Sequence, residues 1–187
     1  VWLAGMASTV NFVDGVDGLA TGVTAIAALI LCIHMVRLEQ YTVALLPLAL
    51  LGCCLGFLPY NFYPARIILG GGAFVLGFAL GTLSIVAGAK VASALLVVWM
   101  PLLDVLWQVY CRWQRGQAVA LGDRGHLHFR LQDLGWPPPR IVLLYYGITA
   151  TLGSAALLIS SRLLKLVVLV AVALMTFGFL AVLRRRT

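Results

Sequence analysis

The sequence is poor in charged residues. They make up 10% of its 187 residues, and only six of them are Asp or Glu. A soluble domain has about 25% charged and about 45–50% apolar residues, whereas this chain is 63% apolar. Too little polar surface remains to cover a globule in water. A soluble fold, a disordered chain and a collagen-like chain are therefore excluded.

The four cysteines lack the spacing of a metal site or a disulfide framework. Cys32, Cys53 and Cys54 lie inside apolar runs, where a thiol behaves as a small hydrophobe. The sequence also lacks an initiator Met and a signal peptide. Its first polar motif residue, Asn11, comes only ten residues after Val1. We therefore expect the chain to be the C-terminal part of a longer protein.

The apolar residues form six runs, each close to the about 20 residues that a membrane span needs. Their approximate ranges are 19–36, 42–59, 67–87, 91–109, 141–160 and 163–183. Residues 1–10 are typical of the end of a further helix. We expect an all-α fold, a polytopic transmembrane helical bundle of about six spans plus a partial N-terminal helix. Residues 1–187 then form one membrane domain, with a polar loop at 110–140.

The net charge of +7 predicts the orientation of the bundle. Basic charge is also typical of nucleic-acid binding, but here the basic residues are scattered between apolar runs. If residues 11–18 lie on one face, alternating spans divide the basic residues unequally between the two faces. That face receives Arg66, Arg112, Arg115, Arg124, Arg130, Arg140, Arg184, Arg185 and Arg186, and the other receives Arg37, Lys90, Arg162 and Lys165. The richer face is predicted to be cytoplasmic, and it brings the polar segments 11–18, 61–66 and 123–129 to one rim.

The first polar segment carries Asn11, Asp14 and Asp17. On a helix, the two carboxylates would share a face at i and i+3, with the amide one turn before. Two like charges so close favour a cation or a hydrogen-bonding substrate between them. The alternative is a helix N-cap followed by a solvated first turn, where Asp is also favourable.

The third polar segment carries His126 and His128, flanked by Arg124 and Arg130. Histidine and arginine together favour phosphate or diphosphate oxygens through charge-assisted hydrogen bonds. A zinc site is disfavoured because no cysteine or third histidine lies near. The alternative is a basic loop attracted to anionic lipid head groups.

The remaining candidates have mainly structural interpretations. Asp104 lies in an apolar run and either supports a site or snorkels to the membrane surface, and the lone His34 is expected to be packed. The glycines at 70–72 lack the strand and the Lys-Ser/Thr of a phosphate-binding loop. The small-residue spacings at 52–56 and 77–81 favour close helix packing.

Three segments then resemble one known family, in its order and with similar spacing. They are NFVDGVDGLATG, FLPYNFYPARIILGGGAFVLGF and DRGHLHFRLQDLGW. Together they are similar to the polyprenyl-phosphate N-acetylhexosamine-1-phosphate transferases, relatives of phospho-N-acetylmuramoyl-pentapeptide transferase. The resemblance covers residues 1 to about 146.

The resemblance implies a reaction at the cytoplasmic face of a bacterial plasma membrane. The phosphate of a membrane polyprenol attacks the β-phosphate of a UDP-amino-sugar, UMP leaves, and the product serves cell-wall or surface-polysaccharide synthesis. Mg²⁺, or Mn²⁺ in its place, is implied as the cofactor, and a homodimer as a possible assembly. The composition agrees, because phosphoryl transfer needs cations to offset charge on the diphosphate.

The resemblance also implies roles for residues. Asn11, Asp14, His126 and His128 match catalytic positions, with Asp14 as the metal ligand. Asp17 is expected near the nucleotide, and Asn61 matches the N-x-x-P-A element. The substrate-binding set that we expect is Asp17, Asn61, Arg66, Arg124 and Arg130.

The chain departs from the family pattern at two positions. Gly70 stands where a metal-binding Asp is expected, and Phe129 stands where a third His is expected. A D-D-x-x-D/K motif of the family would precede residue 1. The alternative function is therefore a degenerate homologue that binds nucleotide-sugar or lipid phosphate without catalysis, which would gain activity only with Asp restored at position 70. A transporter is a third hypothesis, but Asp104 is nearly alone among acidic residues within the spans.

Overall fold

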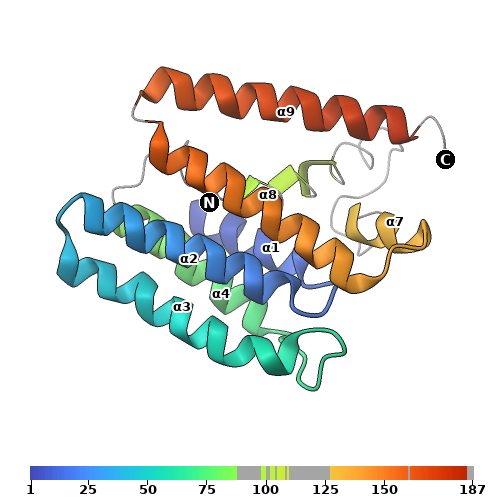
Figure 1. Cartoon of the computed structure of the whole chain (residues 1–187), viewed down its shortest axis with the longest axis horizontal. Helices are drawn as coiled ribbons and strands as arrows, with labels where there is room; N and C mark the ends of the chain where they lie inside the picture. The colour runs from blue at the N-terminus through green and yellow to red at the C-terminus, as the bar shows by residue number, and fades with distance from the viewer. Residues whose placement is uncertain are drawn as a thin grey trace.

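A computed structural model describes residues 1–87, 98–99, 102–103, 105–107, 109, 127–159 and 161–184. Within these ranges the chain forms helices and connecting turns, with no strand (Figure 1). The helices are α1 (Trp2–Val13), α2 (Leu19–Arg37), α3 (Tyr41–Asn61), α4 (Gly72–Val86), α7 (Leu127–Asp133), α8 (Pro138–Leu158) and α9 (Arg162–Arg184). The predicted all-α membrane fold is confirmed.

Three of the described helices are long and apolar enough to cross a membrane, namely α2, α3 and α8. Shorter apolar stretches lie at Gly72–Val86 and Leu163–Gly178. These five segments correspond to five of the six expected spans. The sixth, at 91–109, lies largely outside the described residues.

The helix expected over 67–87 begins later, at Gly72. Residues 62–71 form a loop instead, in which the N–H groups of Arg66 and Ile67 both donate to the Tyr60 carbonyl. Gly70 has a φ of +54°, which is outside the helical region and which glycine adopts without a steric penalty. The residues of this loop are as apolar as those of a membrane span, but their backbone is not helical.

α2 is the central helix of the bundle. It contacts α3 on one side and α8 on another, and it also touches α1 and α4 (Figure 1). Small residues permit these contacts, because a Cβ at Gly22 would collide with the Tyr146 side chain of α8, and Gly153 of α8 faces Ile30. Buried small side chains let membrane helices approach closely. α2 and α8 therefore pack closely along their length.

α1 packs against α4 through the predicted small-residue spacing. A Cβ at Gly77 would lie 2.5 Å from the Met6 carbonyl oxygen, and one at Gly81 would lie 3.1 Å from Met6 Cβ. The Trp2 indole also donates to Ser84 Oγ at 3.1 Å. The corresponding prediction for 52–56 is wrong within the described residues, because a Cβ at Gly52 or Gly56 meets nothing there within 4 Å.

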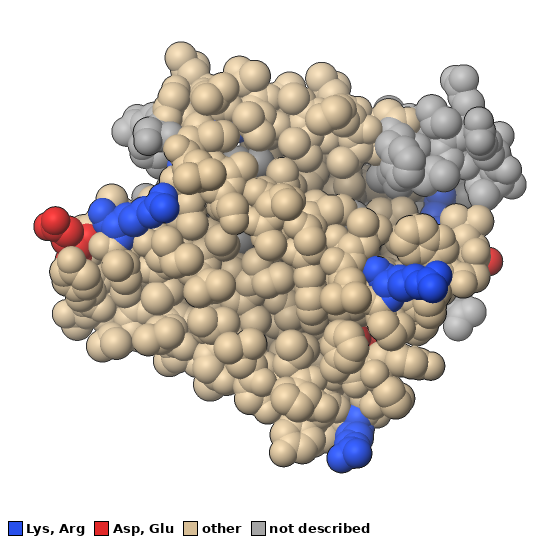
Figure 2. All heavy atoms as spheres, in the orientation of Figure 1, with Lys and Arg blue, Asp and Glu red and all other residues tan. Residues whose placement is uncertain are grey.

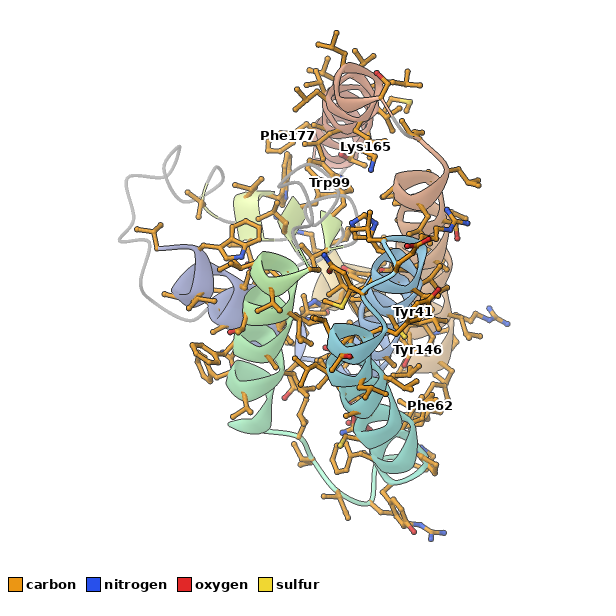
Figure 3. All side chains as sticks on the ribbon, turned by 90° about the vertical axis from the view of Figure 1, so that its left-hand side faces the viewer. Tyr41, Phe62, Trp99, Tyr146, Lys165 and Phe177 are labelled. Carbon is orange, nitrogen blue, oxygen red and sulfur yellow. The ribbon has the colours of Figure 1, made fainter. Side chains whose placement is uncertain are left out.

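α9 lies beyond the main bundle (Figure 1). Figure 3 shows Phe177 and Trp99 between α9 and the other helices. Trp99 belongs to one of the two core clusters, and Phe177 packs against that cluster. The Trp107 and Phe177 rings meet edge to face, with centroids 5.8 Å apart, a favourable aromatic geometry.

Charged side chains lie toward the ends of the helices. On the face shown in Figure 2, a broad band without charge separates them. Arg37 ends α2 and Glu39 follows it, whereas Arg66 and Arg140 belong to the opposite end, after α3 and at the start of α8. This distribution suits helices that cross a bilayer, because charge inside the hydrocarbon is costly.

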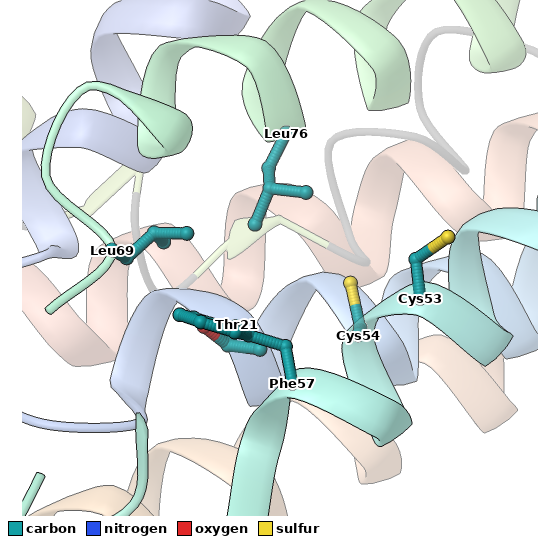
Figure 4. Close-up of a pocket in the computed structure, with 6 residues that line it drawn as sticks. All are labelled: Thr21, Cys53, Cys54, Phe57, Leu69 and Leu76. Atoms are coloured by element: carbon teal, nitrogen blue, oxygen red, sulfur yellow. The ribbon is translucent and has the colours of Figure 1, made fainter. Parts of the chain in front are cut away.

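A small apolar cavity of about 170 Å³ lies between α2, α3 and α4 (Figure 4). Its lining is Thr21, Cys53, Cys54, Phe57, Leu69 and Leu76. The Thr21 hydroxyl already donates to Asn61. The cavity therefore contributes apolar space beneath the loop 62–71 and no acid, base or cation.

Candidate functional site

The first polar segment forms a turn between α1 and α2, residues 14–18. α1 ends at Val13, and the Asp14 N–H donates to the Asn11 carbonyl at 3.2 Å. α2 begins only after Gly18, whose φ is +79°. Asp14 and Asp17 therefore do not share a helix face, contrary to the expectation from their spacing. The glycines at 15 and 18 disfavour a continuous helix through this segment.

Gly18 is also a point of close approach for two other elements. A Cβ there would lie 3.2 Å from the Phe62 Cα atom, and the Tyr146 hydroxyl donates to the Gly18 carbonyl at 2.6 Å. Residues of α8 and of the loop 62–71 thus meet at the start of α2.

Asp17 and Asn61 hold the loop 62–71 in place. Asp17 Oδ2 accepts a hydrogen bond from the Ala65 N–H at 3.0 Å. The Asn61 amide is buried, accepts from Thr21 Oγ1 at 2.7 Å and donates to the Ile67 carbonyl at 3.1 Å. The Asn61 amide oxygen and nitrogen and one Asp17 oxygen thus all form hydrogen bonds within the protein. Both side chains are predicted to contact substrate, and in the structure both position the loop.

Asp14 is the half-buried carboxyl group of the turn. Burial raises its pKa from 3.8 to about 6, the Gly70 backbone N–H lowers the pKa by hydrogen bonding, and the nearby Asp17 charge raises it. Desolvation and a like charge both disfavour the ionised form. A cation beside Asp14 would relieve this cost, so the turn is suited to a positively charged ligand.

His128 brings the third polar segment to the same turn. It is fully buried on α7, and its imidazole lies directly over Gly15. The Phe129 ring lies beside it, with centroids 4.3 Å apart, and also reaches Gly15. α7 ends at Asp133, and Gly135, whose φ is +83°, lies in the turn that follows it. Pro138 is the first residue of α8.

For the other predicted site residues, no contact with the turn 14–18 is described. Arg130 is half-buried on α7, and Arg66 is exposed on the loop 62–71. His126, Arg124, Asp104 and Asp123 lie outside the described residues. His34 lies in the last turn of α2, at the opposite end from the turn 14–18, which agrees with a packing role.

A metal ion would find few protein ligands here. Among the residues that the structure describes, no group of three or more His, Cys, Asp or Glu side chains is close enough to hold one. Asp14 is the available carboxylate, with Asn11 three residues before it. This donor set resembles the way proteins bind Mg²⁺, which often uses one or two carboxylates and takes its other ligands from phosphates and water.

Three contributors to the site were not anticipated from the sequence. Gly15 faces His128, Thr21 bonds to Asn61, and Tyr146 bonds to the turn. Thr21 and Tyr146 are polar groups inside apolar runs, which is the signal that could have found them.

Comparison with known proteins agrees with this arrangement. The model of glycosyl transferase family 4 matches residues 1–88, which contain the turn 14–18 and the loop 62–71. Residues 1–88 belong to this family. Relatives that match a larger part of the chain come from several bacteria.

One similar protein is the decaprenyl-phosphate N-acetylglucosaminephosphotransferase of Mycobacterium tuberculosis, 34% identical over 96% of this chain and 52% of the relative. Another is the phospho-N-acetylmuramoyl-pentapeptide-transferase of Moorella thermoacetica, 36% identical over 83% of this chain and 49% of the relative. A probable undecaprenyl-phosphate N-acetylglucosaminyl 1-phosphate transferase of Bacillus subtilis is 27% identical over 95% of this chain and 51% of the relative. The chain spans about half the length of these curated relatives.

Proposed function

We propose that this chain belongs to an enzyme that transfers N-acetylhexosamine 1-phosphate from a UDP-sugar to a membrane polyprenyl phosphate. The observation that carries the proposal is the meeting of three segments at one end of the bundle. The turn 14–18 contacts the loop 62–71 through Asp17 and contacts α7 through Gly15. The same reaction is supported by the bacterial relatives, whose names contain decaprenyl-phosphate or undecaprenyl-phosphate.

The reaction is a phosphoryl transfer. An oxygen of the lipid phosphate attacks the β-phosphorus of the donor, and a new P–O bond forms. The bond between that phosphorus and the oxygen bridging to the α-phosphate breaks, so UMP leaves with the bridging oxygen. The step balances, because the transferred sugar phosphate and the lipid's own phosphate together form the diphosphate of the product.

The location of the site suits both substrates. A nucleotide-sugar arrives from water, whereas a polyprenyl phosphate arrives from the membrane, so the reaction must occur where helices end. Arg66, Arg130 and Arg140 supply positive charge at that end, which attracts anionic substrates. By the bias of basic residues toward the inside, this end faces the cytoplasm of a bacterium.

Mg²⁺ is the cofactor that this proposal includes. Asp14 would hold it, with the Asn11 amide beside it and substrate phosphate oxygens as further ligands. When bound, the ion supplies neutralisation of the charge that develops on the diphosphate. The raised pKa of Asp14 supports this role, because a bound cation would stabilise the ionised carboxylate.

UMP release tests the proposal. The full-length membrane protein is incubated with UDP-N-acetylglucosamine, Mg²⁺ and undecaprenyl phosphate. We expect Asp14→Asn to lower the rate by at least about a hundredfold, since removal of a preorganised charge costs about 10²–10³ in kcat. His34→Ala is the matched control, at the far end of α2, and should retain activity.

The position of Gly70 favours a second candidate, a homologue that binds substrate without turning it over. Gly70 offers only a backbone N–H to Asp14, and no carboxylate. Aspartate at position 70 would have to adopt a φ of +54°, which is uncommon for a residue with a side chain. Wild-type UMP release would exclude this second candidate, and UDP-sugar binding without release would favour it.

A further inference from the structure

Gly15 lies where a side chain has no room. A Cβ at this position would collide with the His128 imidazole at Nε2, and would come within 2.9 Å of Phe129 Cζ. Separations below 3.0 Å are essentially never seen for real Cβ atoms. The space beside the Gly15 backbone is therefore filled by two residues of α7.

The backbone at Gly15 does not itself require glycine. Among the glycines that the structure describes, positive φ occurs at Gly18, Gly70 and Gly135. Gly15 is not one of them, so alanine fits its backbone conformation. The obstacle to a side chain at this position is the contact with His128 and Phe129.

We propose that Gly15 is a positioning residue whose missing side chain seats the His128 imidazole on the turn that carries Asp14. The contact joins α7 to the turn between α1 and α2, far away in the sequence, and places the imidazole against the residue that follows Asp14. Leu127, next to His128, extends this contact into the core cluster that contains Val13 and Val16. The seating is a property of the fold, and its role in catalysis rests on the proposed function.

Hydrogen–deuterium exchange of the full-length protein tests the seating without an activity assay. In Gly15→Ala we expect the amides of residues 127–133 to exchange at least about tenfold faster, because overpacking of this size destabilises the local structure. The amides of α3 should be unchanged. Gly5→Ala is the matched control, because a Cβ at Gly5 meets nothing within 4 Å. Unchanged exchange of α7 in Gly15→Ala would overturn the proposal.

A double substitution separates seating from general destabilisation. In a His128→Ala background the nearest obstacle is gone and the tip of the Phe129 ring can move into the freed space, so we expect Gly15→Ala to add little to the exchange of residues 127–133. A purely structural effect of Gly15→Ala would add fully in both backgrounds, and that result would contradict the proposal. If Gly15→Ala fails to fold, recovery of folding in the double variant supports the seating, and failure of both variants overturns it.

The same variants give the catalytic consequence. We expect Gly15→Ala to lower UMP release at least about tenfold, and to lower it no further in the His128→Ala background, as for residues that act as a unit. Faster exchange of α7 in a protein whose wild type releases no UMP would leave the seating intact and refute the proposed function alone.

Discussion

At the residue scale, the site depends on one carboxyl group with an unusual environment. Asp14 follows the last residue of α1 and accepts from the Gly70 N–H, and Asp17, three residues later, accepts from the Ala65 N–H. Both acids of the motif thus bond to the loop 62–71, and burial raises the pKa of Asp14. These contacts depend on where the backbone turns, which the spacing of the two residues in the sequence does not show.

The titration of Asp14 is a prediction at this scale. In the metal-free protein its pKa is raised to about 6, so the folded state binds a proton more readily than the unfolded state between about pH 4 and 6. This group therefore makes the folded state less stable as pH rises through that window. We expect a carboxylic-acid infrared band to appear as the pH falls through about 6, and Asp14→Asn should lack it.

Mg²⁺ should lower the midpoint of that titration, because a cation stabilises the ionised carboxylate. The comparison needs only the metal and the protein, without either substrate. A midpoint that does not respond to Mg²⁺ would remove Asp14 as a metal ligand.

At the scale of elements, apolar run length was sufficient to predict most helices. α2, α3, α8 and α9 match runs of the expected length, because hydrocarbon thickness sets the number of apolar residues. Run length was not sufficient for the segment 67–71, whose apolar side chains sit in a loop. Gly70 has a positive φ, and the helical backbone of α4 begins only after it, at Gly72.

Helix packing gives a prediction with opposite signs at two glycines. Gly77→Ala places a Cβ against the Met6 and Ala7 backbone, which cannot move away as a flexible side chain can. Overpacking of this kind costs about 1–3 kcal/mol, so the Tm in detergent should fall. Gly52→Ala is the matched control on α3, where nothing lies within 4 Å, and there alanine should hold or raise the Tm because it favours a helix by about 0.5–1 kcal/mol. An equal fall in both variants would contradict the assigned α1–α4 contact.

At the scale of the whole molecule, the charge pattern and the three motifs predicted convergence at one rim. The structure brings the turn 14–18, the loop 62–71 and α7 together, as Figure 1 shows. The atomic contacts between these segments could not be predicted from the sequence. The contact of His128 with Gly15 joins residues far apart in the chain, and it depends on the packing of α7 on α8 and of α8 on α2.

The central claim is the transfer of a sugar together with its own phosphate to a membrane lipid. The most direct measurement uses the full-length protein in membranes, with a UDP-N-acetylglucosamine donor labelled at the β-phosphate. We predict that the label enters the lipid fraction and that one UMP is released for each label transferred. Release of UDP, or label that remains in the aqueous fraction while sugar reaches the lipid, would contradict it.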